Sequence, residues 1–129
     1  STALPECPQL KLLRMEGSVY FGAAAHVSDT LHALREAPGA PKHLLVMSKS
    51  MNFIDPAGVQ LWAEELQERR AHGGDLYCHR PRPPVLAMWE RGGFLAALGA
   101  DHVFPDKRHA MAAIVPRLDP QVCARCSAR

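Results

Sequence analysis

One cysteine stands where a thiol enzyme would place its nucleophile. Cys78-His79-Arg80 follows a short apolar run, and catalytic groups of α/β proteins gather at the carboxyl ends of strands. A phosphate-binding thiol loop also needs successive backbone N–H groups. The residues that follow Arg80 include prolines, which lack that donor, at Pro81, Pro83 and Pro84. No Asp or Asn stands beside His79 to orient its ring. We therefore expect Cys78 to be a buried strand cysteine and the chain not to be an enzyme.

A second cysteine motif, Cys123-x-x-Cys126, has the spacing of half a zinc site. A structural zinc ion needs about four ligands, and this pair supplies two. Cys7, His79 or His109 would have to come to the same place in the fold to complete it. The histidines show no shared metal-ligand spacing. We expect reduced thiols on a tail that lies outside the fold, no bound metal and no cofactor.

A third candidate is the start of a helix at Asp55-Pro56-Ala57-Gly58. The carboxylate of Asp55 can cap the helix, and Pro56 is tolerated in the first turn because its missing N–H would have no partner there. Helix N-termini bind anions and carboxylates. We expect this corner and the preceding segment to form a loop that binds a partner or an anion. Its residues are Ser48, Lys49, Ser50, Met51, Asn52, Phe53, Asp55, Pro56, Ala57 and Gly58. Met51 and Phe53 are its expected exposed apolar contacts, and a simple helix cap with no binding role remains an open alternative.

The elements that must position these residues follow from the hydrophobic pattern. Within 43–74, Leu44 to Met47 predicts a buried strand, and Ser48 to Asn52 a polar loop. An amphipathic helix is then indicated by apolar residues at i, i+3, i+4 and i+7, and Gly73-Gly74 ends it. These apolar residues are Val59, Trp62, Ala63 and Leu66. Trp62, like Trp89 further on, is expected in the core.

The remaining segments alternate in the same way. Residues 10–15 and 19–21 predict a β-hairpin that turns at Glu16-Gly17. Further strands are expected at 76–78 and 103–104, with helices beginning near residues 22, 84, 94 and 107, the last capped by Asp106. The pattern predicts an α/β domain with about five strands in a mixed, mostly parallel sheet, covered by four to five helices. Residues 1–9 form an irregular lead-in, 10–118 the domain and 119–129 the C-terminal tail.

Charge limits the classes of partner. The chain has 129 residues and a formal net charge of +2, which is too small to indicate binding to nucleic acid. No apolar run approaches the roughly 20 residues that cross a bilayer. Arginines on one side of the domain could rest on an anionic leaflet. The candidates are Arg69, Arg70, Arg80, Arg82 and Arg91.

Several of these segments, taken in order, resemble the STAS domain, the fold shared by bacterial anti-sigma-factor antagonists and the cytoplasmic tails of SulP anion transporters. The resemblance covers about residues 10–118. It rests on Phe21-Gly22-Ala23-Ala24, Phe53-Ile54-Asp55-Pro56-Ala57-Gly58, Gly73-Gly74-Asp75-Leu76-Tyr77, Arg82-Pro83-Pro84-Val85, Arg91-Gly92-Gly93-Phe94 and Val103-Phe104-Pro105. The first two motifs, and Leu118-Asp119-Pro120 with the cysteine pair after it, are more typical of the SulP branch.

One departure separates the two branches. In free-standing antagonists, a Ser or Thr directly before the motif glycine accepts phosphate from a kinase, and here that position is Ala57. The resemblance thus implies a regulatory domain of a SulP-type transporter of sulfate, bicarbonate or dicarboxylate, at the cytoplasmic face of the inner membrane. Its implied partners are the transporter's own transmembrane domain, a cytoplasmic regulatory protein or a second copy of the chain. The alternative is a free-standing anti-sigma-factor antagonist.

Overall fold

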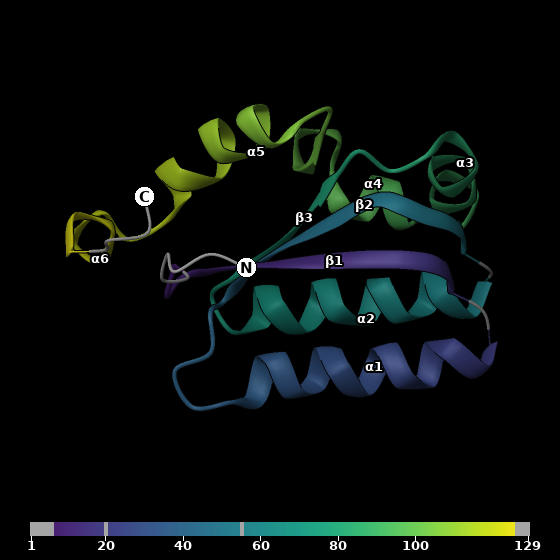
Figure 1. The fold of residues 1–129 in the computed structure, drawn as a ribbon, viewed down its shortest axis with the longest axis horizontal. Helices are drawn as coiled ribbons and strands as arrows, with labels where there is room; N and C mark the ends of the chain where they lie inside the picture. The colour runs from purple at the N-terminus through teal and green to yellow at the C-terminus, as the bar shows by residue number, and fades with distance from the viewer. Residues whose placement is uncertain (1–6, 20, 55, 126–129) are drawn as a thin grey trace.

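The computed structural model describes residues 7–19, 21–54 and 56–125. Four parallel strands form one sheet in the order β1-β2-β3-β4: β1 (Leu10–Val19), β2 (His43–Ile54), β3 (Asp75–His79) and β4 (Val103–Phe104). Helices lie on both faces of the sheet (Figure 1). The α/β class and the mostly parallel sheet expected from the sequence are confirmed.

The predicted N-terminal hairpin is wrong. The segment is one long strand, β1, that pairs in parallel with β2 from Leu10↔His43 to Val19↔Ile54. Where the turn was expected, at Glu16-Gly17, the pairing of β1 with β2 shifts register instead. The shifts lie between Arg14 and Glu16 and between Gly17 and Ser18. Such irregularities bend a strand without ending it, and a glycine often marks them.

The predicted loop at residues 48–52 is also wrong, because β2 continues through it to Ile54. Its polar residues do not break the strand because β1 runs alongside and supplies hydrogen-bond partners along this length. The long β2 therefore reaches past the end of β3, which pairs only with residues 43–47 of β2. This overhang places the second half of β2 at the carboxyl edge of the sheet.

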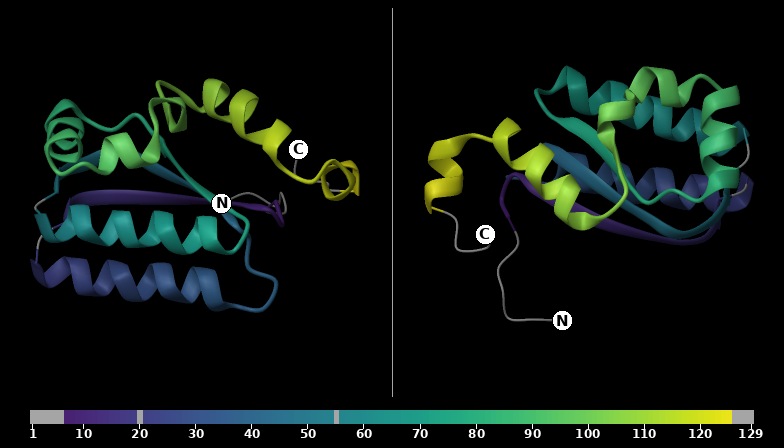
Figure 2. Two further views of the ribbon diagram at one scale, coloured as in Figure 1. Left: turned by 180° about the vertical axis from the view of Figure 1, so that it is seen from behind. Right: turned by 90° about the horizontal axis from the view of Figure 1, so that it is seen from above.

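One face of the sheet is covered by four helices: α1 (Phe21–Glu36), α2 (Pro56–Ala71), α3 (Pro83–Arg91) and α4 (Phe94–Leu98). The views of Figures 1 and 2 show α1 and α2 side by side under the long strands. The larger hydrophobic cluster fills this layer, and Trp62 and Trp89 are buried in it as predicted. Gly73 ends α2 as expected, with a left-handed φ of 84°, and at Gly74 a Cβ would collide with the carbonyl oxygen of Lys42.

The opposite face carries a smaller cluster under α5 (Lys107–Ile114). Leu45 and Tyr77 belong to it, whereas their neighbours Leu44 and Leu76 belong to the larger cluster, as the alternation of a strand requires. Asp106 caps α5 by accepting a hydrogen bond from the backbone N–H of His109 at 2.7 Å, as the sequence predicted. Two short 3-10 turns, η1 (Ala100–His102) and η2 (Val115–Arg117), flank β4 and α5.

The segment after Leu118 is not a tail outside the fold. It forms α6 (Pro120–Arg125), and Cys123 packs against the smaller cluster. Gln9 links this segment to the start of β1, since its Oε1 accepts from the backbone N–H of Asp119 at 2.7 Å and its Nε2 donates to the carbonyl oxygen of Asp119 at 3.1 Å. The expectation failed because apolar Leu118 and Cys123 provide enough contact to dock the segment.

Candidate functional site

The carboxyl edge of the sheet is where parallel α/β proteins most often bind ligands. Here it joins the overhanging half of β2, the turn after β3 and the first turn of α3. Of the predicted binding residues, Ser48, Met51 and Gly58 are buried and Lys49 is exposed. Met51 is 0% exposed and belongs to the larger core cluster, so the prediction that it is an exposed contact is wrong. The strand that replaces the expected loop turns its side chain inward.

The side chains of the other predicted binding residues lie outside the described structure. Asp55, the expected cap of α2, lies outside the described residues, and so do the side chains of Ser50, Asn52, Phe53, Pro56 and Ala57. Ser48 does have a described contact, because its hydroxyl donates to the carbonyl oxygen of Val46 at 3.3 Å. That bond is buried and local, so Ser48 is not available to an external partner.

What the structure brings together at this edge is a basic hollow, formed by Lys49, Arg80 and Arg82. The Nε of Arg82 donates to the backbone carbonyl of Lys49 at 2.9 Å, which joins the turn after β3 to the overhang of β2. The hollow has a volume of about 370 Å³, and no Asp or Glu is found among the described residues that line it. Its remaining lining is proline: Pro81, Pro83 and Pro105. Three cations without a carboxylate in the lining favour an anionic partner.

The expected cluster of five arginines is not found. Arg80 and Arg82 lie at the carboxyl edge, whereas Arg69 is buried and paired with Glu65, and Arg70 is paired with Asp75 at the opposite edge of the sheet. The third member of the basic hollow, Lys49, was not predicted to join them. Lys49 lies beside the two arginines because β2 continues to Ile54. The polar residues around Lys49 had predicted a loop there instead.

The turn that carries Arg80 has an unusual backbone. Arg80 has a φ of 50°, the only positive value among the described non-glycine residues. Its N–H donates to the carbonyl oxygen of Phe104 at 2.9 Å and so ties the end of β3 to β4. A left-handed residue with a Cβ costs about 1 kcal/mol. The fixed turn and the prolines after it hold the rim of the basic hollow in one conformation.

The Cys78–His79 pair does not form a catalytic thiol site. Cys78 packs in the larger cluster, and the next residue of a strand points to the opposite face, so the two side chains are separated by the sheet. Burial raises the pKa of the Cys78 thiol far above its ordinary value, which keeps it protonated at neutral pH. Burial, helped by the charge of Arg80, lowers the pKa of His79, and its Nδ1 has no hydrogen-bond partner in the described structure. The prediction that Cys78 is a buried strand cysteine is confirmed.

The described residues also contain no group of three or more His, Cys, Asp or Glu side chains that could hold a metal ion. Cys123 instead accepts a 3.4 Å hydrogen bond from Nε2 of Gln9, and His109 is paired with Asp106. Cys126 lies outside the described residues. Within the described part of the chain, no helix has the length and apolar character needed to cross a membrane.

Comparison with protein families assigns this fold. Residues 2–110 match the family model described as the STAS domain. The chain belongs to the STAS domain family. This match spans most of the domain expected from the sequence motifs, and the resemblance proposed from those motifs is confirmed.

Solved structures show the same fold as this STAS domain. A sulfate transporter family protein from Wolinella succinogenes superposes with a TM-score of 0.71 at 23% identity, covering 88% of this chain and 90% of that one. The STAS domain of a SulP transporter from Vibrio cholerae superposes with a TM-score of 0.68 at 22% identity, covering 88% of this chain and 85% of that one. The anti-sigma factor antagonist SpoIIAA, in its unphosphorylated form, superposes with a TM-score of 0.68 at 17% identity, covering 87% of this chain and 93% of that one.

The chain also resembles part of a much larger protein. In the murine anion transporter Solute Carrier 26 family member A9, in its inward-facing state, the match has a TM-score of 0.70 at 19% identity. It covers 82% of this chain but only 18% of that transporter. A search of curated proteins gives no match.

Opposite the basic hollow, the amino edge of the STAS domain holds a charge network that the sequence did not predict. His102 lies at its centre: its Nε2 is 2.9 Å from Oδ2 of Asp75 and 3.1 Å from Nη1 of Arg117, and its Nδ1 is 2.8 Å from Oδ1 of Asp101. Arg70 donates to the other oxygen of Asp75 at 2.9 Å. Burial acts to raise the pKa of Asp75, but hydrogen bonds from the Leu76 N–H, His102 and Arg70 outweigh it and lower that pKa below its ordinary value.

Aromatic rings continue this network into the core. Tyr77 stacks on His102 with ring centres 5.1 Å apart and on His43 at 5.9 Å, and the guanidinium of Arg117 lies 5.6 Å from the Tyr77 ring centre. Burial lowers the pKa of His43. These residues come from β2, β3, η1 and η2, so their contacts fix the C-terminal segment to the sheet. No sequence motif joins residues so far apart in the chain.

Proposed function

We propose that this STAS domain is the non-catalytic regulatory domain of a SulP-type secondary anion transporter of the sulfate, bicarbonate or dicarboxylate class. In this proposal it docks on the transporter's own membrane domain, or on a cytoplasmic regulatory protein, at the cytoplasmic face of the inner membrane. In this proposal catalysis plays no part, because the thiol that the sequence singled out, Cys78, is buried and protonated.

The observation that carries the proposal is the residue before Gly58. Ala57 has no hydroxyl, so this position cannot accept a phosphoryl group. A free-standing antagonist controlled by phosphorylation at this position would lose its switch. A domain attached to a transporter does not need one there, since its partner is always present at a high effective concentration.

The docking surface in this proposal is the carboxyl edge. The basic hollow presents Lys49, Arg80 and Arg82, and no ion-pair partner is found for any of them in the described part of the chain. Unpaired charges at a rim steer association and select partners of opposite charge. An acidic patch on the membrane domain or on a regulatory protein is the complementary surface.

The experiment that tests the proposal starts from the native gene. We expect the reading frame upstream of Ser1 to encode about ten or more apolar spans of about 20 residues each, as a transporter requires. The complete protein, reconstituted in vesicles, should take up labelled sulfate, bicarbonate or a dicarboxylate, and deleting residues 10–118 should change the uptake rate. A start codon directly before Ser1, with no membrane spans, would contradict the proposal and favour the antagonist.

A further inference from the structure

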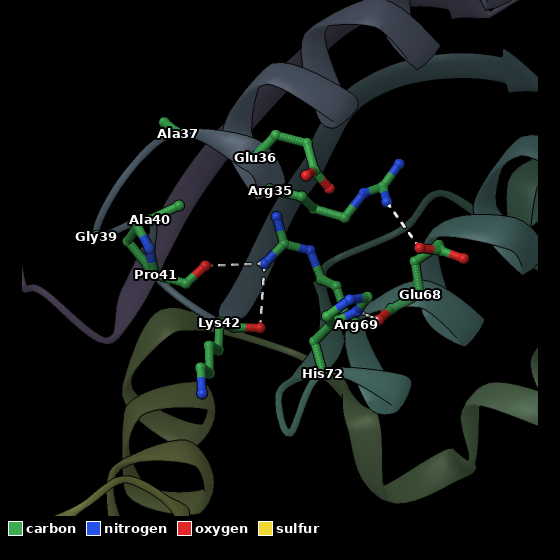
Figure 3. Close-up of a pocket in the computed structure, with 10 residues that line it drawn as sticks. All are labelled: Arg35, Glu36, Ala37, Gly39, Ala40, Pro41, Lys42, Glu68, Arg69 and His72. Carbon is green, nitrogen blue, oxygen red and sulfur yellow. Dashed lines mark hydrogen bonds and ion pairs between the residues drawn. The ribbon is translucent and has the colours of Figure 1, made fainter.

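A second hollow lies at the other end of the molecule, between the ends of α1 and α2 and the loop that leads into β2. It has a volume of about 310 Å³ and is lined by Arg35 to Ala37, Gly39 to Lys42, and Glu68, Arg69 and His72. Figure 3 shows these side chains around the opening. The volume lies at the small end of the range for ligand sites in proteins, which suits a small metabolite.

The floor of this hollow is a buried arginine. Arg69 is 3% exposed. Its Nε is paired with Glu65, and its Nη1 donates to the carbonyl oxygens of Pro41 at 3.2 Å and Lys42 at 3.1 Å. Its Nη2 is buried and has no hydrogen-bond partner in the described structure. Figure 3 shows this nitrogen pointing away from the two carbonyls, into the space below Glu36 and beside Ala40.

An unpaired donor on a buried guanidinium is rare in proteins, and it requires an acceptor. The neighbouring arginine does not compete for that acceptor, since Arg35 is already paired with Glu65 at 2.9 Å and Glu68 at 3.2 Å. Lys42 also lines the hollow, and no ion-pair partner of its amine is found among the described residues. The free donor to a carboxylate in this hollow is therefore Nη2 of Arg69, since Figure 3 shows the Lys42 amine pointing away from it.

The same space also holds acceptors. Glu36 lines the hollow, no ion-pair partner is found for it among the described residues, and its carboxylate points into the opening in Figure 3. Both α1 and α2 also end here, at Glu36 and Ala71, and the carbonyl end of a helix carries partial negative charge. These groups favour an ammonium.

The charges around the hollow are balanced. The hollow and the residues paired with it hold equal numbers of basic and acidic side chains: Arg35, Lys42 and Arg69 against Glu36, Glu65 and Glu68. A ligand with only negative charge would face Glu36, and a ligand with only positive charge would face Arg69. A ligand that carries both charges satisfies both sides.

We propose that this hollow binds a small zwitterion of the free α-amino acid class. The carboxylate accepts from Nη2 of Arg69, and the ammonium lies against Glu36 and the ends of the two helices. The site is separate from the basic hollow and does not depend on the proposed docking function. It would let the domain respond to a metabolite.

The test uses the chain of residues 1–129 labelled with ¹⁵N and four probes: glycine, L-alanine, L-aspartate and L-lysine. We expect at least one to give saturable shifts, with a dissociation constant of about 1 mM or tighter, at the amides of Gly39 and Ala40 and at the Arg69 side chain. Propionate and ethylamine, which keep one charge of alanine each, should fail to saturate at about 10 mM.

Exposed residues serve as variants, so loss of folding does not confuse the result. Glu36→Gln should weaken binding by at least about fivefold, whereas the distant Glu90→Gln should leave it unchanged. If propionate or ethylamine bound as tightly as alanine, the proposal that the ligand is a zwitterion would be contradicted. Absence of saturable shifts at these residues with all four amino acids, or unchanged binding in Glu36→Gln, would overturn the site.

Discussion

Both edges of the sheet carry charged residues but use them differently. At the amino edge, His102 contacts both Asp75 and Arg117, and Arg70 closes the network on Asp75. At the carboxyl edge, Lys49, Arg80 and Arg82 surround a hollow with no described carboxylate in its lining. Charges that are mutually paired stabilise a fold, whereas unpaired charges of one sign are available to a partner.

This contrast assigns separate roles to the two edges. Substitutions at the amino edge should lower stability and leave partner binding to the folded protein intact. Substitutions at the carboxyl edge should change binding with little effect on stability. Four changes follow, in order of the size of their expected effect on the free energy of unfolding. The first sets the scale for a buried ion pair, and the other three test this division.

The largest loss is expected from Glu65→Leu. Glu65 is 3% exposed and pairs with both Arg35 and Arg69, so its removal leaves the buried guanidinium of Arg69 without its carboxylate. Breaking a buried pair in this way should lower the free energy of unfolding by about 3 kcal/mol. Urea denaturation measures the loss, and the exposed Glu64→Leu, on the same helix, is the control, with an expected change below about 0.5 kcal/mol.

Asp75→Asn should cost about 2 kcal/mol, because the carboxylate accepts from the Leu76 N–H, Arg70 and His102. The pKa of Asp75 is lower in the folded protein than in the unfolded chain. Its contribution is therefore complete above the unfolded value of 3.8 and is lost as pH falls through the lower folded value. The stability of Asp75→Asn should fall less steeply with acid in this range. An unchanged acid profile would show that the network does not hold Asp75.

Arg80→Gly is expected to leave stability unchanged or to raise it by up to about 1 kcal/mol, since glycine adopts the φ of 50° without steric cost. The same change removes one cation of the basic hollow and should weaken partner binding. A thermal melt and a binding measurement on the same preparation would separate the two effects. Loss of more than about 2 kcal/mol would place Arg80 among the residues that stabilise the fold.

The smallest effect on stability is expected from Lys49→Gln, within about 0.5 kcal/mol of the parent protein. The residue is exposed, its carbonyl accepts from Arg82, and no hydrogen bond of its side chain is found in the described structure. Lys49 nevertheless lines the basic hollow. Binding to the partner should weaken and should become less sensitive to salt. If Lys49→Gln lost as much stability as Asp75→Asn, the proposed difference between the two edges would be contradicted.

Local signals in the sequence predicted most of the fold. Pro56 marked the first residue of α2, Gly73 its end, and Asp106 the cap of α5. Such signals act within one turn of the chain. Glu16-Gly17 was misread as a hairpin turn because the partner of β1 is not its neighbour in sequence but β2, which begins at His43.

The sites were harder to predict than the elements. Arg80 and Arg82 were singled out, but Lys49 joins them only through the overhang of β2. At the amino edge, Asp75, His102 and Arg117 lie far apart in sequence and meet only after β3, η1 and η2 pack together. The unpaired nitrogen of Arg69 depends on where the loop carbonyls of Pro41 and Lys42 fall. None of these distances follows from spacing along the chain.

The most direct test of the division between the edges is a binding measurement with charge reversals. The STAS domain would be titrated onto the membrane domain of the proposed transporter. Lys49→Glu/Arg82→Glu would be compared with Lys42→Glu/Arg91→Glu, which makes the same charge change at exposed residues that do not line the basic hollow. We predict that the first pair lowers affinity by at least about tenfold and that the second pair does not. The first pair should lose no more than about 1 kcal/mol of stability, from the hydrogen bond between Arg82 and the Lys49 carbonyl. Equal affinities for the two double variants would contradict the assignment of docking to the carboxyl edge.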